Sequence, residues 1–169
     1  MRYGVERASW ALNSLIIVAI LTFAFTNYTE VMAKDLLIKV SDEDRYCLQQ
    51  NVFFEARNQS IKGQVAVAWV TLNRVKNSNF PATICEVVWQ SKQFSWTHDG
   101  KPDEPAKTEV ARRAWEDAGL ISEIVLFEWL KGSKGPVGGA TFYHADYVMP
   151  AWAKEKKWLG IVDNHIFYK

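Results

Sequence analysis

Residues that commonly build metal centres are scarce in this sequence. It has two cysteines and three histidines among its 169 residues. Neither type forms the close pairs, such as Cys-x-x-Cys or His-x-x-x-His, that many zinc sites use. We therefore expect no metal site and no cofactor.

The chain also lacks an excess of charge of either sign. Its net charge is +1, and acidic and basic residues are mixed along its length. A nucleic-acid-binding surface would need a basic face or stripe, so no nucleic-acid partner is expected. No internal repeat or low-complexity tract is present, and a hydrophobic content of 49% argues against disorder. These features predict one domain after the N-terminal segment.

Only one long apolar run is present, at residues 11–25, and Arg2 and Arg7 precede it. This order is typical of an export signal, although a full membrane span needs about 20 apolar residues. Residues 1–33 are therefore interpreted as a cleaved signal peptide, or as an uncleaved anchor that holds residues 11–26 in the membrane. Both forms predict export of the remaining chain to the periplasm or the cell-wall face.

The rest of the chain, residues 41–169, is predicted to be mainly helical and to end in a small antiparallel sheet. Ser41 and Thr83 each stand before a sequence typical of a helix N-terminus, and Gly119 is expected to end a helix. The expected helices cover residues 42–57, 63–76, 83–89, 105–118 and 122–130, and the expected strands cover 140–144, 159–162 and 165–168.

Glu55 is the candidate catalytic residue, because it is an acid within a run of bulky apolar residues. On a helix, Leu48 and Val52 precede it on the same face. Such a face is poorly hydrated, and desolvation raises the pKa of a carboxyl. A carboxyl that stays partly protonated near neutral pH can give a proton to a leaving group. The alternative is that Glu55 forms a surface ion pair with Arg57 or Lys62.

A second candidate segment is the irregular stretch at residues 91–105, because long loops in compact domains are often functional. Gln93 and Ser95 supply hydrogen-bonding groups beside the rings of Phe94 and Trp96. This combination suits a sugar ring. The alternative is that Phe94 and Trp96 only pin the loop to the core.

Seven short motifs of the chain occur in an order that resembles the SleB-like cell-wall hydrolases, a family that includes spore-cortex-lytic enzymes and phage or bacterial peptidoglycan hydrolases. They are Phe-Glu-Ala-Arg at 54–57, Gly-Gln-x-Ala-Val at 63–67, Val-x-x-Asn-Arg-Val at 70–75, Phe-Pro-x-Thr-Ile-Cys at 80–85, Gln-Phe-Ser-Trp at 93–96, Gly-Ala-x-Phe-Tyr-His at 139–144 and His-x-Phe-Tyr at 165–168. The resemblance covers roughly residues 47–168.

The resemblance implies a lysozyme-like, mainly helical α+β domain that cleaves the glycan strand of peptidoglycan, usually as a lytic transglycosylase. Its partner would be the glycan strand, and a monomer acting in cell lysis or wall remodelling is expected. The family's catalytic acid corresponds to Glu55. Substrate contacts are expected from Gln93, Phe94, Trp96, Tyr143 and His165.

The resemblance also bears on the two cysteines. Cys47 and Cys85 match a subgroup with one cysteine before the Glu-Ala-Arg motif and another after the Phe-Pro motif, which favours a disulfide outside the cytoplasm. The chain departs from the pattern at residues 58–59, where Asn-Gln replaces the Gly-Glu of many relatives. It also lacks the wall-binding repeats of the spore enzymes, so it looks more like a phage endolysin or a small bacterial wall hydrolase.

Two other functions are compatible with the sequence. A zinc amidase that cuts the peptide stem would have to draw its ligands from His98, His144 and His165. A non-catalytic, exported glycan-binding protein would stack Trp96 and Trp152 on sugars. If the glycosidase used two carboxylates, the second would come from one of three acids placed only by position: Glu86, Asp99 and Asp146.

Overall fold

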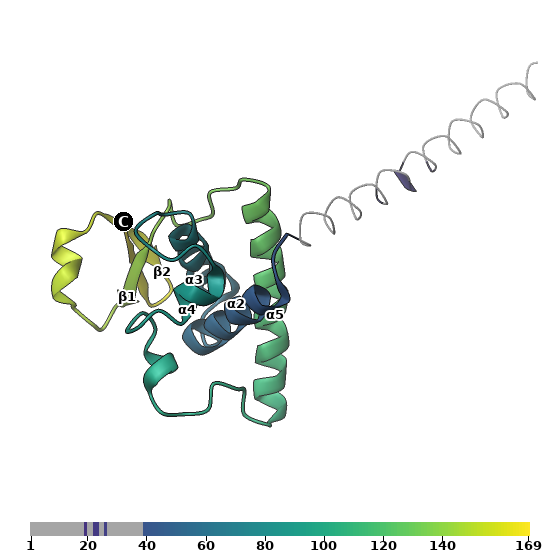
Figure 1. Ribbon diagram of the computed structural model, residues 1–169, viewed down its shortest axis with the longest axis horizontal. Helices are drawn as coiled ribbons and strands as arrows, with labels where there is room; N and C mark the ends of the chain where they lie inside the picture. Colours follow the sequence, from purple (N-terminus) through teal and green to yellow (C-terminus); the bar gives the residue numbers. More distant parts are fainter. Residues whose placement is uncertain (1–18, 20–21, 24–25, 27–38) are drawn as a thin grey trace, which may run out of the picture. The chain divides into compact units, whose positions relative to one another are not determined.

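The computed structural model describes residues 19, 22, 23, 26 and 39–169 (Figure 1). The chain divides into two compact units, residues 1–39 and 40–169. The predicted signal peptide or anchor therefore lies outside the described residues, apart from four helical positions. Within the part of the chain that the structure describes, no helix combines the length and the apolar character needed to cross a membrane.

Residues 40–169 form a mainly helical body with a small three-stranded sheet, as predicted. The α-helices are α2 (Asp42–Ala56), α3 (Ile61–Val75), α4 (Ile84–Val88) and α5 (Glu109–Leu130). Helix α2 packs against the other three, and α3 also packs against α4 and α5. The largest fully buried side chains come from all four of these helices and include Leu48, Phe53, Leu72, Val87 and Leu126. The core therefore lies where the four helices meet.

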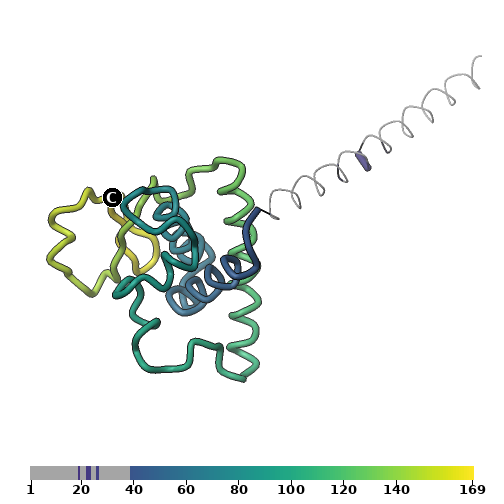
Figure 2. The backbone as a smooth tube through the Cα atoms, viewed as in Figure 1, coloured from purple at the N-terminus to yellow at the C-terminus, as the bar shows by residue number. Residues whose placement is uncertain are grey.

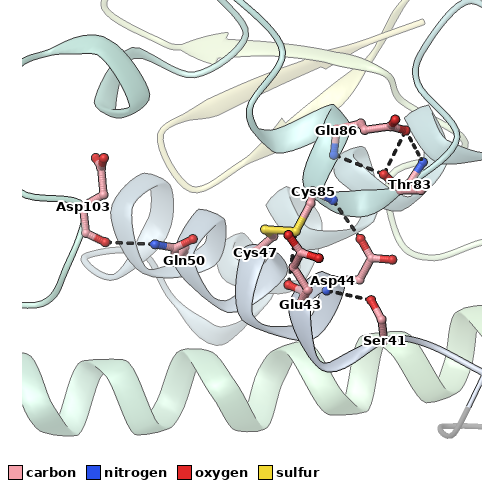
Figure 3. The surroundings of a disulfide bond; sticks show 9 residues. All are labelled: Ser41, Glu43, Asp44, Cys47, Gln50, Thr83, Cys85, Glu86 and Asp103. Carbon is pink, nitrogen blue, oxygen red and sulfur yellow. Dashed lines mark hydrogen bonds between the residues drawn. A yellow bond between two sulfur atoms is a disulfide. The ribbon is translucent and has the colours of Figure 1, made fainter.

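Both predicted helix starts are confirmed. The Ser41 hydroxyl accepts a hydrogen bond from the backbone N–H of Asp44. Thr83 and Glu86 form a reciprocal capping box at α4. Asp44 does not close such a box with Ser41, because its carboxylate accepts the backbone N–H of Cys85 at 2.9 Å (Figure 3). The start of α2 is thus tied to the start of α4.

The cysteines strengthen this tie. Cys47 of α2 and Cys85 of α4 form a disulfide, which agrees with the pairing that the resemblance implied (Figure 3). The bond joins residues 38 positions apart in the sequence. A cross-link of this kind stabilises the fold mainly by restricting the unfolded chain.

The predicted break at Gly119 is wrong, because α5 is one helix of 22 residues that runs through this position. A Cβ at this position would lie 2.7 Å from Nε2 of Gln49. That nitrogen donates to the carbonyl of Trp115, so the glycine lies where α2 and α5 approach closely. Gly119 is therefore a packing glycine and not a helix terminator. Helix α5 starts at Glu109 and not at Pro105, and the hydroxyl of its N-cap Thr108 accepts the N–H of Ala111.

The sheet consists of β1 (Phe142–Ala145), β2 (Trp158–Val162) and β3 (His165–Tyr168). It is antiparallel, in the order β1-β3-β2. Residues 40–169 also contain two 3₁₀-helices, η1 (Ser95–His98) in the long loop and η2 (Ala151–Glu155) in the connection from β1 to β2. In Figure 2 this connection loops away from the helices at the left of the molecule.

The turn between β2 and β3 is anchored to the start of α3. The Asp163 carboxylate accepts hydrogen bonds from the backbone N–H and the hydroxyl of Ser60, at 2.9 and 2.7 Å. A Cβ on Gly63 would lie 2.4 Å from the same carboxylate, so this contact needs glycine there. The helical layer thereby sets the position of β3.

Candidate active site

A cavity of about 520 Å³ opens between the C-terminal end of α2, the loop before η1, and the sheet. Helix α3 contributes one side chain, Arg74, to its lining. The candidate site residues Glu55, Gln93, Phe94, Tyr143 and His165 all line this cavity. Segments far apart in the sequence thus meet around Glu55.

Glu55 is half-buried in the last turn of α2. Its Oε2 accepts a hydrogen bond from the Tyr143 hydroxyl at 2.7 Å. Burial raises the pKa of Glu55, while the bond from Tyr143 and the charge of Arg74 partly offset this rise. The direction is the one expected of a general acid that works near neutral pH.

The cation that acts on Glu55 is not the one suggested by its neighbours in the sequence. Arg57 lies over the ring of Phe53, 4.8 Å from the centroid. The charge that lowers the pKa of Glu55 comes instead from Arg74 on α3. The alternative of a surface pair of Glu55 with Arg57 or Lys62 is therefore replaced by an electrostatic effect of Arg74, which lines the same cavity.

Tyr143 is held in β1 opposite Phe167 of β3. Its ring packs edge-on against His165, with centroids 5.1 Å apart. Burial and the adjacent Glu55 raise the pKa of Tyr143 well above its usual value. The hydroxyl therefore keeps its proton and acts as a permanent donor to Glu55.

Arg74 was not among the site residues predicted from the sequence. Its side chain is only 3% exposed, and its Nε donates to the carbonyl of Thr141 at 2.8 Å. With the Gln93 amide oriented so that its oxygen faces Arg74, that oxygen accepts from both terminal guanidinium nitrogens, at 3.0 and 3.1 Å. The available signal was its spacing, because Val67, Thr71 and Arg74 fall on one face of a core helix. A cation on a buried face needs dedicated partners.

The structure places the expected substrate contacts in two groups. Gln93, Phe94, Tyr143 and His165 line the cavity. Trp96 does not, because it is buried and stacks on Phe54 with centroids 4.7 Å apart. Of the two alternatives for this loop, pinning to the core fits Trp96, whereas Phe94 both packs inward and reaches the cavity.

His165 is neutral near pH 7. Burial lowers the pKa of His165, and Asp163 and Asp146 only partly oppose this effect. Its Nδ1 is buried and has no hydrogen-bond partner among the residues that the structure describes. Burying an N–H donor in this way would cost free energy, so we place the ring proton on Nε2.

Glu55 is the single carboxylate among the described residues that line the cavity. The acids considered as a second carboxylate lie elsewhere. Glu86 belongs to the α4 capping box, and Asp99 is paired with Lys101. Asp146 does not contribute to the lining either. The arrangement therefore offers one proton-transferring carboxyl.

Over residues 39–169 and the four described positions before them, no three His, Cys, Asp or Glu side chains are grouped to hold a metal ion. Of the three histidines, His144 and His165 line the cavity and His98 lies on η1.

Known proteins resemble this chain in sequence and in fold. The family model for Cell Wall Hydrolase matches residues 58–168. The spore cortex-lytic enzymes of Halalkalibacterium halodurans and Bacillus subtilis are each 35% identical to it, over 132 and 133 residues. Each alignment covers 75% of this chain, but only 35% and 38% of those proteins. The chain thus spans less than half the length of these curated relatives.

Two solved structures share the fold. The catalytic domain of the Bacillus cereus SleB protein aligns with a TM-score of 0.55 and 30% identity, covering 77% of this chain and 92% of that one. The catalytic domain of the germination-specific lytic transglycosylase SleB from Bacillus anthracis gives a TM-score of 0.53 and 28% identity, covering 76% and 96%. The fold prediction is confirmed in its mainly helical body and small antiparallel sheet.

Proposed function

The chain belongs to the cell wall hydrolase family, and we propose that it cleaves peptidoglycan as a lytic transglycosylase. The bond cleaved is the one between N-acetylmuramic acid and N-acetylglucosamine, and Glu55 is the general acid and base. The similarity to a protein described as a lytic transglycosylase supports this reaction. The family match begins at residue 58, so the role of Glu55 rests on the geometry of the cavity.

Glu55 is the one carboxylate that the described residues bring to the cavity wall, and this observation carries the proposal. A glycosidase that uses water or forms a covalent intermediate generally needs two carboxylates on opposite sides of the bond. An intramolecular transfer needs one. The nucleophile is then the 6-hydroxyl of the muramyl residue itself, which the sugar holds near the reacting carbon.

The reaction proceeds in two proton transfers on the same side chain. Glu55 first gives its proton to the bridging oxygen, and the bond from that oxygen to the anomeric carbon of the muramyl residue breaks. The Glu55 carboxylate then takes the proton of the 6-hydroxyl while the oxygen of that hydroxyl bonds to the anomeric carbon. The products are a 1,6-anhydromuramyl end and a new glucosamine end, and Glu55 is protonated again.

The surroundings of Glu55 suit both transfers. Burial favours the protonated form needed for the first transfer. The Tyr143 hydrogen bond stabilises the carboxylate needed for the second. Phe142, Tyr147 and Trp152 add aromatic surface to the cavity wall, which suits the apolar faces of sugar rings.

Fragment analysis tests this reaction directly. The purified chain is incubated with purified peptidoglycan, and the soluble products are identified by mass spectrometry. Anhydromuramyl ends are expected, and Glu55→Gln should release none. Reducing muramyl or glucosamine ends would instead show hydrolysis by water. Free peptides would indicate an amidase, and binding without any fragments would indicate a glycan-binding protein.

We also propose that the protein acts outside the cytoplasm, held by residues 11–26 or released after residue 33. The Cys47–Cys85 disulfide supports this location, because such bonds persist in oxidising compartments. Fractionation of cells, followed by N-terminal sequencing of the protein, distinguishes an anchored chain from a processed one. Recovery of the intact, reduced chain in the cytoplasm would contradict export.

A further inference from the structure

We propose that Arg74 is the positioning residue of this site, which holds the loop with Gln93 in place and sets its positive charge in the cavity that Glu55 also lines. This inference rests on the proposed function for its consequences in catalysis. Its structural basis is independent of the reaction. It consists of a buried cation, the segments it joins, and the acid that its charge reaches.

Arg74 is a buried cation whose hydrogen-bond partners are all neutral. Its three hydrogen bonds go to the carbonyl of Thr141 and the amide oxygen of Gln93. Among the described residues, no carboxylate lies within ion-pair distance of it. Burial lowers the pKa of Arg74 to about 10, so the side chain still carries its charge at neutral pH. That charge is therefore not cancelled by an ion pair, and it acts on Glu55.

The same side chain connects three segments of the cavity wall. It originates on α3, and through Gln93 it holds the loop that precedes η1. Through the carbonyl of Thr141 it holds the residue before β1, the strand that carries Tyr143. The centroids of the Phe80 and Phe94 rings lie 5.5 and 5.2 Å from its guanidinium carbon, and each ring adds cation–π attraction.

Few side chains could both hold the cavity wall through hydrogen bonds and supply a positive charge to the cavity. The planar guanidinium presents several donors in a fixed fork, so it can bind one amide oxygen twice and a carbonyl at the same time. A lysine would keep the charge without the fork. A glutamine would keep some hydrogen bonding without the charge. The two substitutions therefore separate the electrostatic task from the geometric one.

Arg74→Gln tests the electrostatic task. Without the cation, the pKa of Glu55 should rise further, because one of the two effects that favour its carboxylate is lost. The measurement is a titration of the Glu55 carboxyl by carbon NMR, assigned with Glu55→Gln and made without substrate. The alkaline limb of the pH profile for peptidoglycan cleavage should move to higher pH by a similar amount. We also expect a loss in kcat of about 10²-fold.

Arg74→Lys tests the geometric task and also serves if Arg74→Gln does not fold. The pKa of Glu55 should stay near the wild-type value, while the loss of the fork to Gln93 should raise KM. Arg57→Gln is the matched control, because it removes an exposed arginine close to Glu55 in the sequence that does not line the cavity. It should change neither the pKa nor the pH profile.

The outcomes are distinguishable from a failure of the proposed function. Cleavage by Glu55→Gln at the wild-type rate would overturn the proposed function, whereas the titration of Glu55 in the Arg74 variants needs no cleavage. A folded Arg74→Gln protein with an unchanged pKa of Glu55 would overturn the electrostatic part of the inference. Wild-type KM and kcat in Arg74→Lys would overturn the geometric part.

Discussion

The two ends of helix α2 hold acidic side chains in opposite surroundings. At the N-terminal end, Asp42, Glu43 and Asp44 lie in the first turn, where the helix dipole favours negative charge. At the C-terminal end, no basic residue stands in the last turn, and Glu55 faces a cavity. The first group stabilises the fold through the helix dipole and, at Asp44, through the tie to α4. Glu55 is kept in conditions that favour its protonated form.

This difference separates structural acids from a reactive one on a single helix. Asp44 accepts a backbone N–H at the start of α4, beside the Cys47–Cys85 disulfide (Figure 3). Glu55 accepts one side-chain hydroxyl and remains partly open to the cavity. Changes at the first end should therefore affect stability, and changes at the second should affect activity.

The largest effect is expected from Glu55→Gln. Loss of general acid catalysis typically lowers rates by about 10²–10⁴-fold, so cleavage of peptidoglycan should fall by at least that much. Asp44→Asn is the control at the other end of the helix and should keep wild-type cleavage. Release of soluble muropeptides over time measures both variants, and equal loss of activity in the two would remove the contrast.

Glu55→Gln should also change the pH dependence of the stability of the fold. Because the pKa of Glu55 is raised, the folded state holds this proton more tightly than the unfolded chain does. The resulting stability is present below the unfolded pKa and is lost as the pH rises through the folded pKa. Glu55→Gln cannot ionise, so its Tm should exceed that of the wild type at about pH 8 and lose this advantage in acid. Thermal unfolding across pH measures the difference.

Removal of the disulfide should have the next largest effect, and it should act on stability. A cross-link that spans 38 positions contributes about 2–4 kcal/mol. The double variant Cys47→Ala, Cys85→Ala should lose this amount in urea unfolding while it keeps cleavage at temperatures where it is folded. A folded double variant without activity would show that the two ends of α2 are coupled.

Tyr143→Phe should have a smaller effect, confined to the C-terminal end. It removes the hydroxyl that favours the carboxylate, so the pKa of Glu55 should rise. We expect the alkaline limb of the activity profile to move to higher pH, with a loss in kcat of about 10-fold, the effect of one hydrogen bond to a charged group. An unchanged profile would mean that Tyr143 serves packing alone.

Ser41→Ala should have the smallest effect. The Ser41 hydroxyl caps α2 through the N–H of Asp44, and loss of such a cap costs about 1 kcal/mol. Urea unfolding should detect this loss, and cleavage should be unchanged. Ser41→Asp retains a capping oxygen and should restore most of the stability.

Local features of the fold were predictable from the sequence to the extent that their causes are local. The starts of α2 and α4 follow from side chains that bind backbone groups three residues away. The helix end predicted at Gly119 was wrong, because glycine is needed there for close packing against Gln49 of another helix. Trp96 was assigned to the substrate because its surroundings in the sequence are polar, yet its ring packs on Phe54. Sequence neighbours do not reveal which side of a loop faces the core.

By itself, the sequence determined the family, the order of the helices and strands, and an acid placed beside apolar residues, because these depend on short-range patterns and on motifs in register. Only the tertiary structure decided which groups act on that acid. Arg74 and Tyr143 reach Glu55 from α3 and β1, and Arg57, two residues away in the chain, turns to Phe53 instead. The physical reason is that the pKa of a buried carboxyl depends on charges and donors close in space, and folding alone brings these together.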